Sequence, residues 1–249
     1  MSTRLKLTVA YDGAPFSGWQ SQANRNGVQD RLEAAFALVC GEQVRVHGAG
    51  RTDAGVHALA QCAHVDLPAR RHDARRWAAA LNGILPPTIR IMRAAFTQSS
   101  FHARFSAKGK RYRYRIWNAE VLPPFELGKA WHVRAPLDLH AMQAAARQLL
   151  GRHDFASFAA NRGKPVADTI RSVSHAHVQR TGPLVVVEIE GDGFLYKMVR
   201  LIVGTLVRVG LGTADTHEIE ARLCHPKRSF PSGRNAAPAA GLFLIRIRY

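Results

Sequence analysis

One segment of the chain combines loop-forming glycines with side chains that could do chemistry. It runs from His47 to Ala58 and reads His-Gly-Ala-Gly-Arg-Thr-Asp-Ala-Gly-Val-His-Ala. So many glycines in a short span fit neither a strand nor a helix, so we expect a shaped loop whose backbone closely approaches something else. The loop carries Arg51, Asp53 and His57, and loops on a rigid scaffold commonly hold functional sites.

The residue types leave several roles open for this loop. Asp53 could cap a turn beside Arg51, which would be a purely structural role. It could instead act as a nucleophile or a general base, or bind a metal with His57. A metal site is disfavoured, because hard cations need several carboxylates and the segment supplies one. The sequence therefore indicates a site around Asp53 without fixing its chemistry.

A second chemical feature is the alternating segment Arg111-Tyr-Arg-Tyr-Arg-Ile-Trp117, which lies in a run without acidic residues between Asp73 and Glu120. As a strand, it would place three arginines on one face and the aromatic side chains on the other. This pattern is typical of a solvated basic face over an apolar core. Since no carboxylate lies nearby in the sequence, it is also compatible with phosphate contact by the arginines and base or core stacking by a tyrosine such as Tyr112.

A third feature is a predicted helix over residues 195–210. Lys197, Arg200, Gly204 and Arg208 fall within roughly 80° of one another at 100° per residue, and the remaining positions are apolar. A core helix with one wet edge would explain this pattern. Arg200 has apolar neighbours on both sides, and a partly buried arginine favours a carboxylate or phosphate partner.

The other histidines and the cysteines show no pattern of ligands. The three cysteines lie far apart without a Cys-x-x-Cys motif, so we expect reduced thiols, no zinc or disulfide framework, and a cytoplasmic protein. Histidines without ligand spacing are His64, His102, His132, His153, His175 and His177.

The charge balance indicates a polyanionic partner. Thirty-five Lys and Arg against eighteen Asp and Glu give +17, while 47% hydrophobic residues suffice for a folded core. A general bias of the composition toward arginine, which provides 28 of the 35 cations, would explain the positive charge without any such partner. Membrane insertion and secretion are disfavoured, because the first ten residues lack an apolar signal region and the apolar stretch 194–211 contains three cations.

Strand-like and helix-like segments must position these residues. The periodicity predicts helices over 28–41, 73–82 and 195–210, a helix capped by Asp138, and a short helix with Asp215 and Glu218 at capping-box spacing. Strands are predicted over 5–9, 43–47, 61–67, 88–96, 110–117, 170–181, 184–189 and 242–248. We expect two α+β domains, 1–106 and 107–249, each a mostly antiparallel sheet with helices on one face.

Several motifs, in this order along the chain, resemble the A-type tRNA pseudouridine synthases over nearly the whole chain. They are Tyr11-Asp-Gly, Gly18-Trp-Gln, Val28-Gln with Leu32-Glu, Gly50-Arg-Thr-Asp-Ala-Gly-Val-His57, Phe101-His-Ala-Arg-Phe-Ser106, Arg111-Tyr-Arg-Tyr114, Met198-Val-Arg200 with Ile202-Val-Gly204, and Gly241-Leu-Phe-Leu.

The resemblance implies two similar domains flanking a basic cleft, and a homodimer that binds tRNA. It implies conversion of uridines 38, 39 and 40 of the anticodon stem-loop to pseudouridine, without cofactor or metal. By the same resemblance, Asp53 is the catalytic aspartate and Tyr112 packs against the target base. Arg51 lies in the catalytic loop, and Arg200 is expected to pair with Asp53.

Two other functions compete with this one. A non-catalytic RNA-binding protein on the same scaffold would use the charge and the Arg/Tyr strand and would not need Asp53. A metal-dependent phosphoesterase would use Asp53 and His57, and the scarcity of neighbouring carboxylates counts against it.

Overall fold

The computed structural model describes residues 3–68, 72–160, 168–226 and 236–249. The chain divides into two units, one of residues up to Lys108 together with Phe243–Tyr249, the other of Gly109–Leu242. Each unit combines a mostly antiparallel set of strands with helices, so the α+β class expected from the sequence is confirmed. None of the helices among the described residues is long and apolar enough to cross a membrane.

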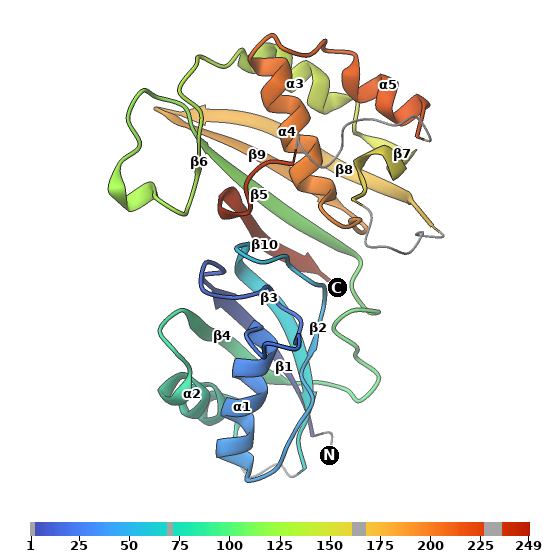
Figure 1. Cartoon of the computed structure of the whole chain (residues 1–249). Coiled ribbons are helices and arrows are strands. Elements are labelled where there is room, and N and C mark those ends of the chain that lie inside the picture. Colours follow the sequence, from blue (N-terminus) through green and yellow to red (C-terminus); the bar gives the residue numbers. More distant parts are fainter. Residues whose placement is uncertain (1–2, 69–71, 161–167, 227–235) are drawn as a thin grey trace. The chain divides into compact units, whose positions relative to one another are not determined.

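The first unit contains the loop with Asp53. Its strands follow the order β4-β1-β3-β10, with β2 beside β3; β1 is antiparallel to both neighbours, and β10 runs parallel to β3. Figure 1 shows the two helices side by side against these strands. The elements are β1 (Arg4–Tyr11), α1 (Val28–Cys40), β2 (His47–Gly48), β3 (His57–Asp66), α2 (Ala74–Ile84), β4 (Ile89–Phe96) and β10 (Leu242–Arg248).

The core of the first unit follows from the sequence pattern. Alternate side chains of β1, including Leu5 and Leu7, are fully buried. The helices contact each other through Phe36 and Trp77, whose ring centroids lie 5.8 Å apart. Helix α2 begins after Asp73, whose carboxylate accepts a hydrogen bond from the backbone N–H of Arg76. Asp73 therefore caps this helix.

The second unit places β5, β9, β8 and β7 side by side in an antiparallel arrangement, with β6 parallel to β5. Three helices pack on one another and cover these strands (Figure 1). The strands and α-helices are β5 (Gly109–Trp117), β6 (Trp131–His132), α3 (Leu139–Arg147), β7 (Gly151–Asp154), β8 (Ile170–Thr181), β9 (Leu184–Gly191), α4 (Met198–Gly210) and α5 (Glu218–Cys224).

The predicted strand over 43–47 is wrong for most of its length, since only His47 joins β2. The backbone of Val46, just before β2, forms hydrogen bonds with side chains of α1 instead. The N–H of Val46 donates to a carboxylate oxygen of Glu33, and its carbonyl accepts from the amide of Gln29. Backbone groups satisfied by α1 do not need a strand partner.

The predicted helix starts in the second unit also need correction. Helix α4 begins at Met198, because Lys197 adopts a left-handed conformation with φ 58°; Lys197 therefore does not share the helical face of Arg200. Helix α5 begins at Glu218 without the predicted capping box. The Asp215 carboxylate accepts from the N–H of His217, while that of Glu218 pairs with Arg208.

Candidate active site

The loop that carries Asp53 is held by close backbone approach from residues 12–20. A Cβ on Gly13 would lie 2.0 Å from the carbonyl oxygen of Val56, and one on Gly18 would lie 2.5 Å from that of Thr52. Gly18 also has φ +96°, which only glycine adopts readily. The close approach expected for this loop is therefore present, and its partners are the glycines of the preceding segment.

Hydrogen bonds fix the backbone on both sides of Asp53. The carbonyl of Thr52 accepts from the backbone N–H of Trp19 at 3.1 Å, and the carbonyl of Asp53 accepts from that of Val56 at 3.1 Å. The loop then turns through Gly55, whose φ is +76°. Asp53 itself is half-buried. A half-buried carboxylate on a fixed backbone is well placed for nucleophilic or base chemistry.

A buried hydroxyl pair anchors the residue before Asp53. The phenol oxygen of Tyr11 lies 2.8 Å from Oγ1 of Thr52, and both residues are buried. Burial raises the pKa of Tyr11 to about 12, so its phenol remains neutral at physiological pH. Sequence reasoning missed both residues as parts of the site. The motif Tyr11-Asp-Gly at a strand end was the available signal, but the sequence does not show where the phenol points.

Arg51 lies at the surface of the same loop. Its Nε donates to Oε1 of Gln20 at 3.0 Å, and its side chain is exposed. Arg51 and Asp53 stand two residues apart in the same loop, and this hydrogen bond directs the Arg51 side chain to Gln20. Gln20 was not among the predicted site residues.

His57 belongs to the base of the loop. It is the first residue of β3 and is buried, and its ring stacks on Phe243 with centroids 4.5 Å apart. Its Nδ1 lies 3.1 Å from the amide nitrogen of Gly13 and 3.0 Å from a carboxylate oxygen of Asp12. The described residues contain no group of three or more His, Cys, Asp or Glu suited to a metal ion. These contacts favour an anchoring role for His57.

Tyr112 and Arg200 lie in the second unit. Tyr112 is a buried residue of β5 whose ring meets that of Phe194 edge-on, with centroids 5.2 Å apart. Arg200 is half-buried on α4 and donates from Nε to the carbonyl of Ala237 at 2.7 Å. Burial raises the pKa of Tyr114, and the nearby charge of Arg200 opposes that shift.

The arginines of β5 have carboxylate partners that the local sequence does not reveal. Arg111 pairs with Glu190 at 2.6 Å and Arg113 pairs with Glu188 at 2.7 Å, each directly across the β5–β9 pair. Arg115 pairs with Glu126 at 2.8 Å. The prediction that no carboxylate balances this strand is therefore wrong, because β9 is distant in sequence and adjacent in the sheet. These arginines are much weaker candidates for phosphate contact than their charge indicated.

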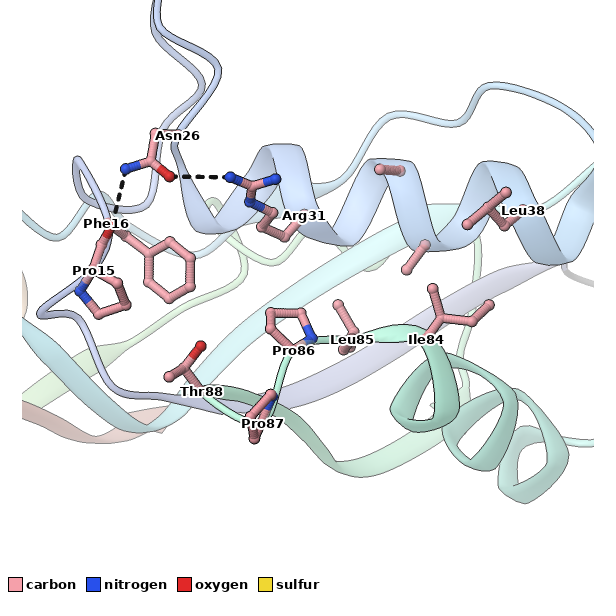
Figure 2. Close-up of a pocket in the computed structure, with 12 residues that line it drawn as sticks. Pro15, Phe16, Asn26, Arg31, Leu38, Ile84, Leu85, Pro86, Pro87 and Thr88 are labelled. Carbon is pink, nitrogen blue, oxygen red and sulfur yellow. Dashed lines mark hydrogen bonds between the residues drawn. The ribbon is translucent and has the colours of Figure 1, made fainter.

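The first unit also contains a pocket of about 520 Å³ between α1 and the segment that follows α2. Figure 2 shows its lining, in which Asn26 bonds to both Arg31 and the backbone of Pro15. None of the four predicted site residues lines it. The pocket is therefore distinct from the loop that carries Asp53.

Comparison with known proteins matches residues 7–106 and 145–249 to a family described as tRNA pseudouridine synthase. A protein of Akkermansia muciniphila named tRNA pseudouridine synthase A is 44% identical over 253 residues, covering 99% of this chain and 95% of that protein. A protein of the same name from Rhodopseudomonas palustris is 44% identical over 247 residues, covering 99% of each. A third, from Halalkalibacterium halodurans, is 43% identical and covers 96% and 90%.

Proposed function

The chain belongs to the tRNA pseudouridine synthase family, and we propose that it converts uridines 38, 39 and 40 of the tRNA anticodon stem-loop to pseudouridine with the carboxylate of Asp53. The observation that carries this proposal is the fixed loop backbone around Asp53, with Arg51 two residues away. The enzyme is an isomerase that acts on tRNA.

The reaction explains why one carboxylate on a fixed loop suffices. Isomerisation breaks the N1–C1′ bond, turns the uracil and forms a C5–C1′ bond. The C5 proton leaves and N1 gains a proton, so the composition of the nucleoside is unchanged. The step needs an ionised carboxylate that acts as nucleophile or base, and surroundings that keep the freed uracil in place. Asp53 supplies the first requirement. Residues that contact the uracil and the neighbouring phosphates of the RNA keep the freed uracil in place.

Tyr112, Arg51 and Arg200 are proposed as the substrate-binding residues. The target base must leave its stack, which costs a few kcal/mol. Packing of Tyr112 against the base would offset part of this cost, since aromatic–base stacking is worth about 1–3 kcal/mol. Arg200 is proposed as the ion-pair partner of Asp53, and Arg51 as a contact to the RNA. We further propose that domains 1–106 and 107–249 flank a basic cleft and that the protein acts as a cytoplasmic homodimer.

Mapping the modified positions tests the substrate proposal. Unmodified tRNA transcripts with uridines at 38, 39 and 40 are incubated with the protein, and pseudouridines are located by carbodiimide adducts that stop primer extension. We expect stops at these positions and none in a transcript with cytidines there. Pseudouridine elsewhere in the tRNA would contradict the proposed positions. Tight binding without any pseudouridine would support a non-catalytic RNA-binding protein instead.

A further inference from the structure

We propose that Gln20 and Gln29 are positioning residues for Arg51. A directed chain of hydrogen bonds runs from the carboxylate of Glu33 through both glutamines to the guanidinium, and holds the arginine in one orientation toward RNA. This inference rests on the proposed function, because it assigns Arg51 to substrate binding.

The orientation of the Gln29 amide is fixed at both of its ends. Its Nε2 lies 2.9 Å from a carboxylate oxygen of Glu33 and 3.2 Å from the carbonyl of Val46. Both groups only accept hydrogen bonds, so this end of the amide must be the NH₂ group. At the other end, Oε1 accepts from the backbone N–H of Ser21 at 3.1 Å. Gln29 is 3% exposed, so water does not compete strongly for these bonds.

The fixed amide of Gln29 in turn fixes the amide of Gln20. Gln20 donates from Nε2 to Oε1 of Gln29 at 2.9 Å, which directs its own Oε1 away from Gln29. That oxygen accepts from Nε of Arg51 at 3.0 Å. Every bond in the chain has one allowed direction, because a reversed amide would place two donors or two acceptors face to face.

The chain connects a cation to an anion through aligned dipoles. Each amide is polarised by the charged group at its end, so the bonds strengthen one another. A surface arginine otherwise samples many rotamers, and ordering it opposes ligand binding. Arg51 donates to Gln20 through Nε, and this is the side-chain hydrogen bond that Arg51 makes among the described residues. The proposal assigns the two terminal nitrogens, as a pre-organised fork, to a phosphate or a base of the RNA.

A double-mutant cycle tests this role. The kinetics of pseudouridine formation and the tRNA dissociation constant are measured for wild type, Gln20→Met, Arg51→Met and the double variant. We expect Gln20→Met to weaken tRNA binding by about tenfold, as for loss of a hydrogen bond to a charged group, and to raise KM more than it lowers kcat. In the Arg51→Met background, the same substitution should change these values less than twofold. If Gln20→Met fails to fold, Gln20→Asn takes its place.

Gln22→Met is the matched control. Gln22 lies in the same segment as Gln20, between β1 and α1. It is exposed, and its amide donates to the backbone carbonyl of Ser17. We expect Gln22→Met to show wild-type tRNA binding and kinetics. An equal loss from Gln20→Met in both backgrounds, or no loss in either, would overturn the positioning role. If wild type forms no pseudouridine, the proposed function fails, and the cycle in tRNA affinity alone still decides the role of Gln20.

Discussion

The phenol of Tyr11 and the hydroxyl of Thr52 lie 2.8 Å apart and join the end of β1 to the residue before Asp53. The two residues are distant in sequence, and both are buried. The strand therefore serves as a rigid support for the loop, and the position of Asp53 depends on a contact that is remote from it in the sequence.

Removing either hydroxyl of this pair should loosen the loop. Tyr11→Phe leaves the Thr52 hydroxyl buried without this partner, and Thr52→Val does the converse. Each should lower the free energy of unfolding by about 1–3 kcal/mol, and each should lower kcat. The double variant should lose less than the sum, because it leaves neither hydroxyl unpaired. Urea denaturation and turnover measurements check this expectation. Strictly additive losses would show that the two hydroxyls are independent.

Gly18→Ala should damage the site beyond its backbone strain. Gly18 and Gly41 both have positive φ, so alanine at either position costs about 1–2 kcal/mol. A Cβ on Gly18 would also meet the backbone of Thr52 at 2.5 Å, whereas one on Gly41 meets nothing within 4 Å. Displacing the loop by ~1 Å can reduce turnover about 100-fold.

Comparing the two alanine variants separates these effects. Thermal unfolding gives the stability of each, and initial rates on tRNA give the activity. We expect Gly41→Ala to retain wild-type turnover and Gly18→Ala to lose most of it. Similar activities in the two variants would contradict the steric argument.

His64 should make the stability of the protein sensitive to acid. Burial, aided by the charge of Arg4, lowers the pKa of His64 to about 4. Between pH 6.5 and 4 the unfolded chain binds a proton at this residue and the folded protein does not. Stability therefore falls as the pH drops through this window, by on the order of 3 kcal/mol in total. Above pH 6.5 the imidazole of His64 is neutral in both the folded and the unfolded state, so its contribution to stability no longer changes with pH.

His64→Gln tests the acid sensitivity, because glutamine keeps an acceptor for the Ala103 N–H that bonds to the imidazole. Urea denaturation between pH 4 and 7 should show a shallower loss of stability for this variant than for wild type. The same substitution at the exposed His177 provides the control. Parallel stability curves for His64→Gln and wild type would refute the assignment.

The ion pairs on β5 predict an unusual salt dependence for tRNA binding. Because Glu188 already compensates Arg113, Arg113→Ala should leave the slope of log Kd against log salt nearly unchanged. Arg51→Ala should reduce the slope by about 0.7–0.9, the value for one phosphate contact. Filter binding over a range of salt concentrations measures both. A reduction near this value for Arg113→Ala would mean that RNA replaces Glu188 as its partner.

Local periodicity predicted much of the fold. The β8–β9 hairpin around Gly182, the Asp138 cap of α3 and the alternating faces of β5 are all present. Each depends on residues that are neighbours along the chain. The loop with Asp53 was identified in the same way, because its glycines and charged residues are contiguous.

Contacts between distant segments could not be predicted. Glu190, the partner of Arg111, is 79 residues further along the chain, so a strand that seemed uncompensated is paired. Residues 43–46 seemed extended, but side chains of α1 satisfy the backbone of Val46. Gln20 and Tyr11 support the loop from segments that show no chemistry of their own. Both stand in motifs that carry the family resemblance, but the sequence does not show where their side chains point.

Tritium release from tRNA labelled at C5 of uridine tests the central claim most directly. Pseudouridine formation replaces the C5 hydrogen with carbon, so release reports the reaction and is insensitive to binding alone. With EDTA present, wild type should release tritium, and Asp53→Asn should release none while retaining its fold and its affinity for tRNA. Release by Asp53→Asn at the wild-type rate would contradict the assignment of Asp53 as the catalytic residue.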